Sequence, residues 1–108
     1  MSYKVLLTND AAKDLDEIFG YIHLNDSPSS AEYVLNQIEN AIANLSHFPE
    51  KGSYPDELIN LGIKQYREVY FKPYRLVYQI IKKTVYIMLI VDGRRDMQTL
   101  LSRRLLDV

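Results

Sequence analysis

The residues best suited to chemistry in this chain are arginines and tyrosines set close together in its second half. They occupy Tyr66–Arg75 and, further on, Asp92–Asp96, which reads Asp-Gly-Arg-Arg-Asp. An arginine guanidinium binds phosphate through two parallel hydrogen bonds, and a tyrosine ring can stack on a base. These residue types predict a surface that contacts an anionic target. The candidate phosphate- or target-contacting residues are Arg67, Arg75, Arg94 and Arg95.

A structural role for the same arginines is the alternative. An arginine inside an apolar strand can pair with a carboxylate and hold neighbouring elements together. The acidic residues nearby in the sequence are Glu68, Asp92 and Asp96. The pattern alone leaves both interpretations open.

Other chemistries lack the residues they need. The chain has no cysteine, which excludes disulfides, thiolate nucleophiles and cysteine zinc sites. His23 and His47 fall near helix ends without a second ligand at metal spacing, so we expect surface residues and no metal. No phosphate loop, GxSxG or HExxH motif occurs, and no cofactor is expected. A run of acids on the first helix is typical of a solvated face: Asp10, Asp14, Asp16 and Glu17.

Composition points to one globular domain with an uneven charge distribution. The 108 residues are 47% hydrophobic and 25% charged, as in ordinary single domains, so residues 1–108 are taken as one domain. The net charge of −1 conceals ten acids against three lysines in residues 1–60, and ten basic residues against four acids in residues 61–108. This asymmetry favours an anionic partner for the basic part.

Membrane insertion and secretion are not expected. The longest apolar run, Val85–Val91, is far shorter than the roughly 20 residues that a membrane helix needs. The first ten residues already reach an acid, unlike a secretory signal. We therefore expect a cytoplasmic protein without a membrane partner.

Two amphipathic helices are predicted to position the first half of the chain. Residues 3–8 have the pattern of a short strand, and Asn9 or Asp10 is expected to cap the helix that follows. Ser27-Pro28 fits an N-cap followed by proline at the first helical position. The second helix carries apolar residues at helical spacing until Pro49 and Gly52 interrupt it. Two such helices with a short link predict an antiparallel hairpin.

Three strands and a short helix are predicted for the second half. Residues 65–71, 74–81 and 84–91 are rich in tyrosine and β-branched residues and are joined by two-residue links. The last of these strands is apolar on both faces, which indicates a central or doubly covered position. The fold class is α+β: an N-terminal strand and helical hairpin packed on a small twisted antiparallel sheet, with a short C-terminal helix. In this topology we expect the four candidate arginines to converge.

At these residues the chain resembles toxins of the RelE/ParE superfamily, the stable partners in type II toxin–antitoxin modules. The resemblance covers nearly the whole chain and rests on the order and spacing of five stretches. They are the opening strand; residues 12–18 with Tyr21-Ile22; Pro49–Gly52; Tyr66-Arg67-Glu68 together with Pro73–Tyr78; and Asp92–Met97. It implies a small twisted antiparallel sheet with a helical hairpin packed on it.

The resemblance leaves the target open between two branches. RelE-like members cut mRNA on the ribosome, whereas ParE-like members poison DNA gyrase without known catalysis. If the chain were a nuclease, Arg67, Arg75 and Arg95 would match the basic positions of the RelE pattern. A further basic position is replaced by Val69, and the C-terminal tyrosine position by Leu101. We therefore favour a gyrase inhibitor and assign no catalytic residue; an inactive member that only binds antitoxin is a further alternative.

The resemblance also implies an antitoxin that wraps around this protein in a hetero-oligomer, through an amphipathic helix or extended strand. The predicted C-terminal helix combines apolar and basic side chains. Leu101 and Leu105 are expected in the core, because apolar helix stripes usually face inward. The candidate antitoxin-docking residues are Leu100, Arg103, Arg104 and Leu106.

Overall fold

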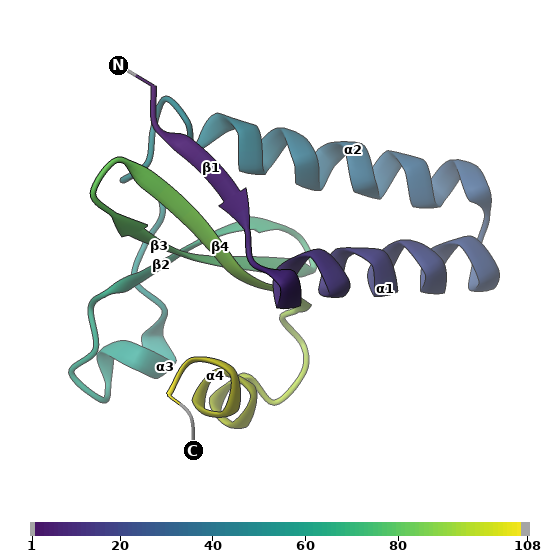
Figure 1. Cartoon of the computed structure of the whole chain (residues 1–108). Helices are drawn as coiled ribbons and strands as arrows, with labels where there is room; N and C mark the ends of the chain where they lie inside the picture. The colour runs from purple at the N-terminus through teal and green to yellow at the C-terminus, as the bar shows by residue number, and fades with distance from the viewer. Residues whose placement is uncertain (1, 107–108) are drawn as a thin grey trace.

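The computed structural model describes residues 2–106 and contains a four-stranded sheet with helices on both sides (Figure 1). None of the helices in these residues is both long and apolar enough to cross a membrane. The elements, in chain order, are β1 (Lys4–Leu7), α1 (Asn9–Asn25), α2 (Pro28–Asn44), α3 (Asp56–Ile59), β2 (Tyr66–Phe71), β3 (Tyr74–Ile81), β4 (Thr84–Asp92) and α4 (Met97–Leu105).

The sheet has the strand order β1-β4-β3-β2. The N-terminal strand β1 runs parallel to β4, and the other neighbours are antiparallel, which confirms the three predicted antiparallel strands. β4 is a central strand, as its apolar residues on both faces predicted. Ile87 and Ile90 belong to one core cluster, and Leu89 and Val91 to the other.

Each face of the sheet is covered by its own helical layer. The predicted α1–α2 hairpin packs on one face, over a core that includes Ile38, Leu45 and Tyr78. The short helices α3 and α4 lie on the other side of the sheet in Figure 1, over a core that includes Leu58, Val77 and Leu101. The sheet is therefore the middle layer of three, and each of its faces packs against a different pair of helices.

The two long helices begin where small polar side chains satisfy free amides. Ser27 caps α2 ahead of Pro28, as predicted, by accepting a hydrogen bond from Ser30 N at 3.0 Å. The predicted cap of α1 was wrong by one residue or two: Thr8 Oγ1, rather than Asn9 or Asp10, accepts from Ala11 N at 3.1 Å. Thr8 N also donates to Ile87 O, so the chain enters α1 directly from its last contact with β4.

The pairing of β2 with β3 places Arg67 and Arg75 on opposite faces of the sheet. The two-residue turn pairs Phe71 with Tyr74, and the same register sets Arg67 against Tyr78 and Tyr70 against Arg75. Directly paired residues share a face, whereas residues one step along a strand alternate. Arg67 therefore lies on the hairpin side and Arg75 on the α3–α4 side. The expected convergence of the four candidate arginines is not what the structure shows.

Candidate functional site

Arg75 is buried in a cluster of charges between β3, β2 and α3. Its Nε donates to Glu68 Oε1 at 2.7 Å, and its Nη1 and Nη2 donate to the two carboxylate oxygens of Glu57 at 2.9 and 2.8 Å. Tyr70 donates its hydroxyl to the remaining oxygen of Glu68 at 2.7 Å. All three guanidinium nitrogens thus donate to carboxylates, so Arg75 has the structural role that was the alternative to target binding.

The same contacts shift the protonation of the groups around Arg75. The guanidinium of Arg75 holds the pKa of Glu57 below its usual value, and the two carboxylates raise the pKa of Arg75. Burial, reinforced by the hydrogen bond to Glu68, raises the pKa of Tyr70 to about 12. At neutral pH the cluster therefore holds a fixed cation and a phenol that stays protonated.

Arg67 holds the loop after α2 on the hairpin side of the sheet. Its Nη1 donates to Gly52 O at 2.9 Å, and its Nη2 donates to the hydroxyl of Tyr54 at 3.1 Å. The guanidinium carbon lies 4.6 Å from the centre of the Tyr54 ring, within cation–π range. Tyr78, the cross-strand partner of Arg67, donates to Pro49 O at 2.7 Å and accepts from Gly52 N at 2.9 Å. Arg67 and Tyr78 together fix this loop.

Arg94 and Arg95 meet at a groove between α1 and the end of β4, which we name the α1–β4 groove. It has a volume of about 390 Å³ and is lined by Ile18, Tyr21, Ile22, Tyr74, Ile90, Arg94, Arg95 and their neighbours. Arg94 is exposed and pairs with Asp92, whose carboxylate oxygen lies 2.6 Å from Nη2. That hydrogen bond lowers the pKa of Asp92. Of the four candidate arginines, only these two share one exposed surface.

The predicted docking residues of α4 divide between core and surface. Leu100 is buried beside Met97, and Leu101 is fully buried, as predicted for Leu101. Leu105 and Leu106 are half-buried and pack against the same core cluster. Arg103 is exposed and lines a hollow of about 300 Å³ that it shares with Arg95.

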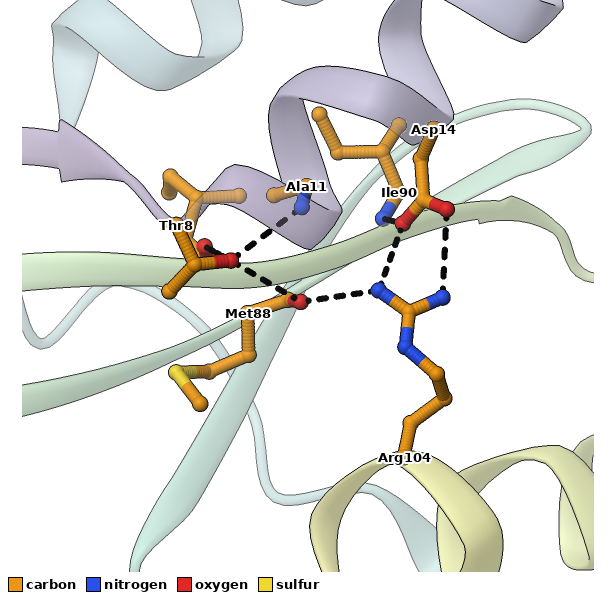
Figure 2. A network of polar contacts seen from close by, with 7 residues as sticks. Thr8, Ala11, Asp14, Met88, Ile90 and Arg104 are labelled. Atoms are coloured by element: carbon orange, nitrogen blue, oxygen red, sulfur yellow. Dashed lines mark hydrogen bonds and ion pairs between the residues drawn. The ribbon is translucent and has the colours of Figure 1, made fainter.

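Arg104 instead belongs to a clasp that joins α4, α1 and β4 (Figure 2). Its Nη1 and Nη2 donate to the two oxygens of Asp14 at 3.1 and 3.0 Å, and Nη2 also reaches Met88 O at 3.2 Å. Asp14 Oδ2 in turn accepts from Ile90 N at 3.0 Å. The strand β1 pairs with β4 only as far as Ile87, so these side chains satisfy the edge of β4 where its strand partner ends.

Two acids that no sequence pattern singled out are central to these arrangements. Asp14 was expected on a solvated helix face, but its side chain is only 14% exposed and carries the clasp. Glu57, the second acid, binds Arg75 from α3 and was not among the acids expected near it. Neither partner is close in sequence: Asp14 and Arg104 are separated by 90 positions, and Glu57 and Arg75 by 18. No local pattern marks either pair.

RNA cleavage would need a group to accept the proton of a ribose hydroxyl, and the side chains here do not favour one. Val69 is half-buried against the hairpin core, and Leu101 is fully buried on the other face. Burial raises the pKa of both Tyr74 and Tyr78, beyond an ordinary phenol value already too high for a base at neutral pH. Neither of these two phenols is therefore suited to accept a proton at neutral pH.

The arrangement of a helical hairpin on a small twisted sheet recurs in solved toxins of toxin–antitoxin systems. A chain from the chromosomal ParDE toxin–antitoxin system of P. aeruginosa superposes with a TM-score of 0.71 at 19% identity, covering 84% of this chain and 96% of that one. A free mutant of the E. coli toxin RelE has a TM-score of 0.66 at 16% identity, covering 100% and 99% of the two chains. The fold is therefore that of RelE/ParE-type toxins.

Sequence comparison narrows the class to one family. The model of the ParE toxin of the type II toxin–antitoxin system parDE matches residues 5–97. Toxin ParE3 from Caulobacter vibrioides is 29% identical over 101 residues, covering 94% of this chain and 97% of its own. The chain belongs to the ParE toxin family, and the RelE/ParE resemblance seen in its sequence is confirmed.

Proposed function

We propose that this ParE-type toxin arrests growth by inhibiting DNA gyrase and that a cognate antitoxin neutralises it. The observation that carries the proposal is the ParE family match over residues 5–97. An antitoxin partner is supported by the fold neighbours, which come from a ParDE system of P. aeruginosa and from a RelBE2 toxin–antitoxin complex of Mycobacterium tuberculosis. The latter has a TM-score of 0.58 at 23% identity, covering 85% of this chain and 99% of that one.

The ion pairs of Arg75 support the role of an inhibitor over that of a nuclease. Among the arginines that match the RelE pattern, Arg75 donates all its nitrogens to Glu57 and Glu68, and Arg67 is committed to Gly52 and Tyr54. Only Arg95 remains on an exposed surface. Three arginines so placed do not surround one phosphate, which transition-state stabilisation would require. Inhibition by docking needs no such constellation.

The target-contacting surface in this proposal is the α1–β4 groove with its exposed arginines. Arg94 and Arg95 follow β4, and Arg103 on α4 lies near Arg95, while the carboxylates of Asp14, Glu17 and Asp92 line the same hollows. Tyr21, a residue that is 69% exposed, adds an aromatic anchor at the same groove. Aromatic and arginine side chains of this kind are enriched among the residues that dominate protein interfaces.

The test is a supercoiling assay with purified gyrase, ATP and relaxed plasmid. We expect the toxin to inhibit supercoiling or to accumulate cleaved DNA, and addition of its antitoxin to restore activity. Reversing one charge with Arg95→Glu should weaken inhibition about tenfold, the scale of one interfacial contact. Lys51→Glu, an equal charge change at an exposed position outside the groove, should leave inhibition unchanged.

Two outcomes would replace the proposal. Growth arrest with intact gyrase activity and cleaved mRNA in a translating extract would establish the ribosome-dependent nuclease instead. Induction without growth arrest would establish an inactive member that only binds antitoxin. In cells, DNA-damage signalling before loss of translation is the expected order for a gyrase inhibitor.

A further inference from the structure

The loop between β4 and α4 carries the two exposed arginines of the α1–β4 groove, Arg94 and Arg95. Gly93 N donates to Pro73 O at 2.8 Å, so the backbone just before Arg94 is still held against the β2–β3 turn. Asp92 then accepts from Arg94 N at 2.9 Å through its side chain and from Arg95 N at 3.2 Å through its carbonyl oxygen. The direction in which both arginines leave the sheet therefore depends on where Gly93 lies.

Gly93 lies against the buried side chain of Arg75, with no room for a side chain of its own. A Cβ on Gly93 would be 2.7 Å from Arg75 Cδ, 2.9 Å from Arg75 Cγ and 3.2 Å from Pro73 O. Carbon atoms in favourable contact stay about 3.5–4.0 Å apart. The φ angle of Gly93 is not positive, so the close approach, and not the backbone conformation, requires glycine here.

The aliphatic part of Arg75 cannot move aside, because its guanidinium is held at three nitrogens. Glu57 binds Nη1 and Nη2, and Glu68 binds Nε. Arg75 is 8% exposed and Glu68 is 4% exposed, so breaking these contacts would leave buried charges unpaired. A planar guanidinium fixed at three points also fixes the methylene groups behind it. Arg75 is therefore a rigid support beneath Gly93.

We propose that Arg75 positions Arg94 and Arg95 for the target, by supporting the loop at Gly93. The inference rests on the proposed docking through the α1–β4 groove and assigns Arg75 and Gly93 as positioning residues, which act through the two arginines. A loop that is ordered before binding loses less entropy when the target binds. The buried charge cluster on the α3–α4 side thus contributes to the activity of the exposed groove.

The first measurement is gyrase supercoiling with the Gly93→Ala toxin. We expect the toxin concentration for half-inhibition to rise about tenfold, the scale of one interfacial contact. In an Arg75→Lys background the same change should cost about threefold or less, because lysine lacks the planar fork and its aliphatic chain can yield to the added methyl group. The matched control is Gly20→Ala, whose Cβ meets nothing within 4 Å and which should inhibit as the parent does.

The second measurement needs no gyrase and follows the loop directly. In two-dimensional amide NMR spectra, Gly93→Ala should shift the backbone signals of Arg94 and Arg95 and the Nε–H signal of Arg75. Signals of the α2 helix should stay in place, which separates a displaced loop from an unfolded protein. Gly20→Ala should leave the signals of Arg94, Arg95 and the Arg75 side chain unchanged.

Three results would overturn the proposal. They are half-inhibition by Gly93→Ala at the parent concentration, an equal loss in the parent and Arg75→Lys backgrounds, and unshifted signals of Arg94 and Arg95. Failure of the proposed function is a different outcome, in which the parent toxin itself leaves supercoiling intact. The variants are then compared by growth arrest after induction, and the NMR result keeps its meaning.

Discussion

At the scale of single residues, paired arginines and buried hydroxyls hold this toxin together on both faces of one strand pair. Arg75 ties α3 to the sheet through Glu57 and Glu68, and on the opposite face Tyr78 ties down the loop after α2. Gly52 is required at that loop, since a Cβ would lie 2.6 Å from the Tyr78 hydroxyl oxygen. These residues stabilise the fold because their buried polar groups provide hydrogen-bond partners for one another.

Tyr78→Phe should destabilise the protein by about 1–3 kcal/mol, because it leaves Pro49 O and Gly52 N without their partner. Urea unfolding followed by circular dichroism measures the change. Tyr33→Phe, which removes an exposed hydroxyl on α2, is the matched control and should change little. Equal stability of the two variants would show that the Tyr78 hydroxyl contributes nothing.

Glu57→Gln should reduce stability most at neutral pH and least in acid. The pKa of Glu57 is lower in the folded chain than its ordinary value of 4.5, so its ionised form stabilises the fold above that pH. The contribution disappears as pH falls through the lowered folded pKa. We expect a difference of about 1–2 kcal/mol at pH ~7 that shrinks toward pH ~3, from unfolding curves at several pH values.

The control for this pH dependence is Glu32→Gln, which makes the same change on the exposed face of α2. Its stability difference from the parent should stay small across the same range. A Glu57→Gln difference that is constant with pH would contradict the assigned role of the Glu57–Arg75 pair.

At the scale of elements, β4 is the strand on which the other parts converge. It pairs with β1 and β3, carries core residues on both faces, and exposes an edge beyond Ile87 that the Asp14–Arg104 clasp closes. An open strand edge invites pairing with another chain. The clasp therefore joins three elements and also blocks this edge.

Asp14→Ala and Arg104→Ala should be energetically coupled, by about 1–3 kcal/mol in a double-mutant cycle. Each single change leaves a partly buried charge without its partner, so the double variant should be less harmful than the sum. In Asp14→Ala the Ile90 amide should also exchange with deuterium faster, since it loses its acceptor. Asp16→Ala on the exposed face of α1 should show neither effect.

At the scale of the whole molecule, two cores share one sheet. The hairpin core and the α3–α4 core are built on opposite faces of the same strands, so loss of one removes support from the other. The charge is divided as well: most acids lie in the helical hairpin half and most basic residues in the sheet and α4 half. The toxin thus presents a different electrostatic character to partners that approach from different sides.

Because the cores share a sheet, the chain should unfold as one unit. Ile38→Ala in the hairpin core and Leu101→Ala in the other should each cost about 2–5 kcal/mol, and both side chains are fully buried. Unfolding followed by far-ultraviolet circular dichroism and by tyrosine fluorescence should coincide in both variants. Separate transitions in Leu101→Ala would instead show that the α3–α4 layer unfolds independently.

The sequence by itself determined the elements, the hairpin and the central position of β4, because these depend on spacing between near neighbours. Three such signals lie between near neighbours in the sequence. They are the apolar periods of the long helices, the Ser27-Pro28 cap and the apolar residues on both faces of Val85–Val91. The family resemblance also followed from the order of short stretches along the chain. The boundary residue Thr8 was missed because neighbouring Asn9 and Asp10 are equally good caps in isolation.

Only the tertiary structure decided which faces the arginines occupy and which acids they meet. The two-residue Lys72-Pro73 link pairs Phe71 with Tyr74 and so puts Arg67 and Arg75 on opposite faces, but which helical layer covers each face depends on packing between elements far apart in sequence. The partners of Arg75 and Arg104 come from α3 and α1, brought near by packing of layers far apart in sequence. Long-range pairing of this kind is set by the three-dimensional arrangement of the whole chain. Of the four candidate arginines, Arg67 and Arg75 therefore have structural roles, and Arg94 and Arg95 lie on the surface.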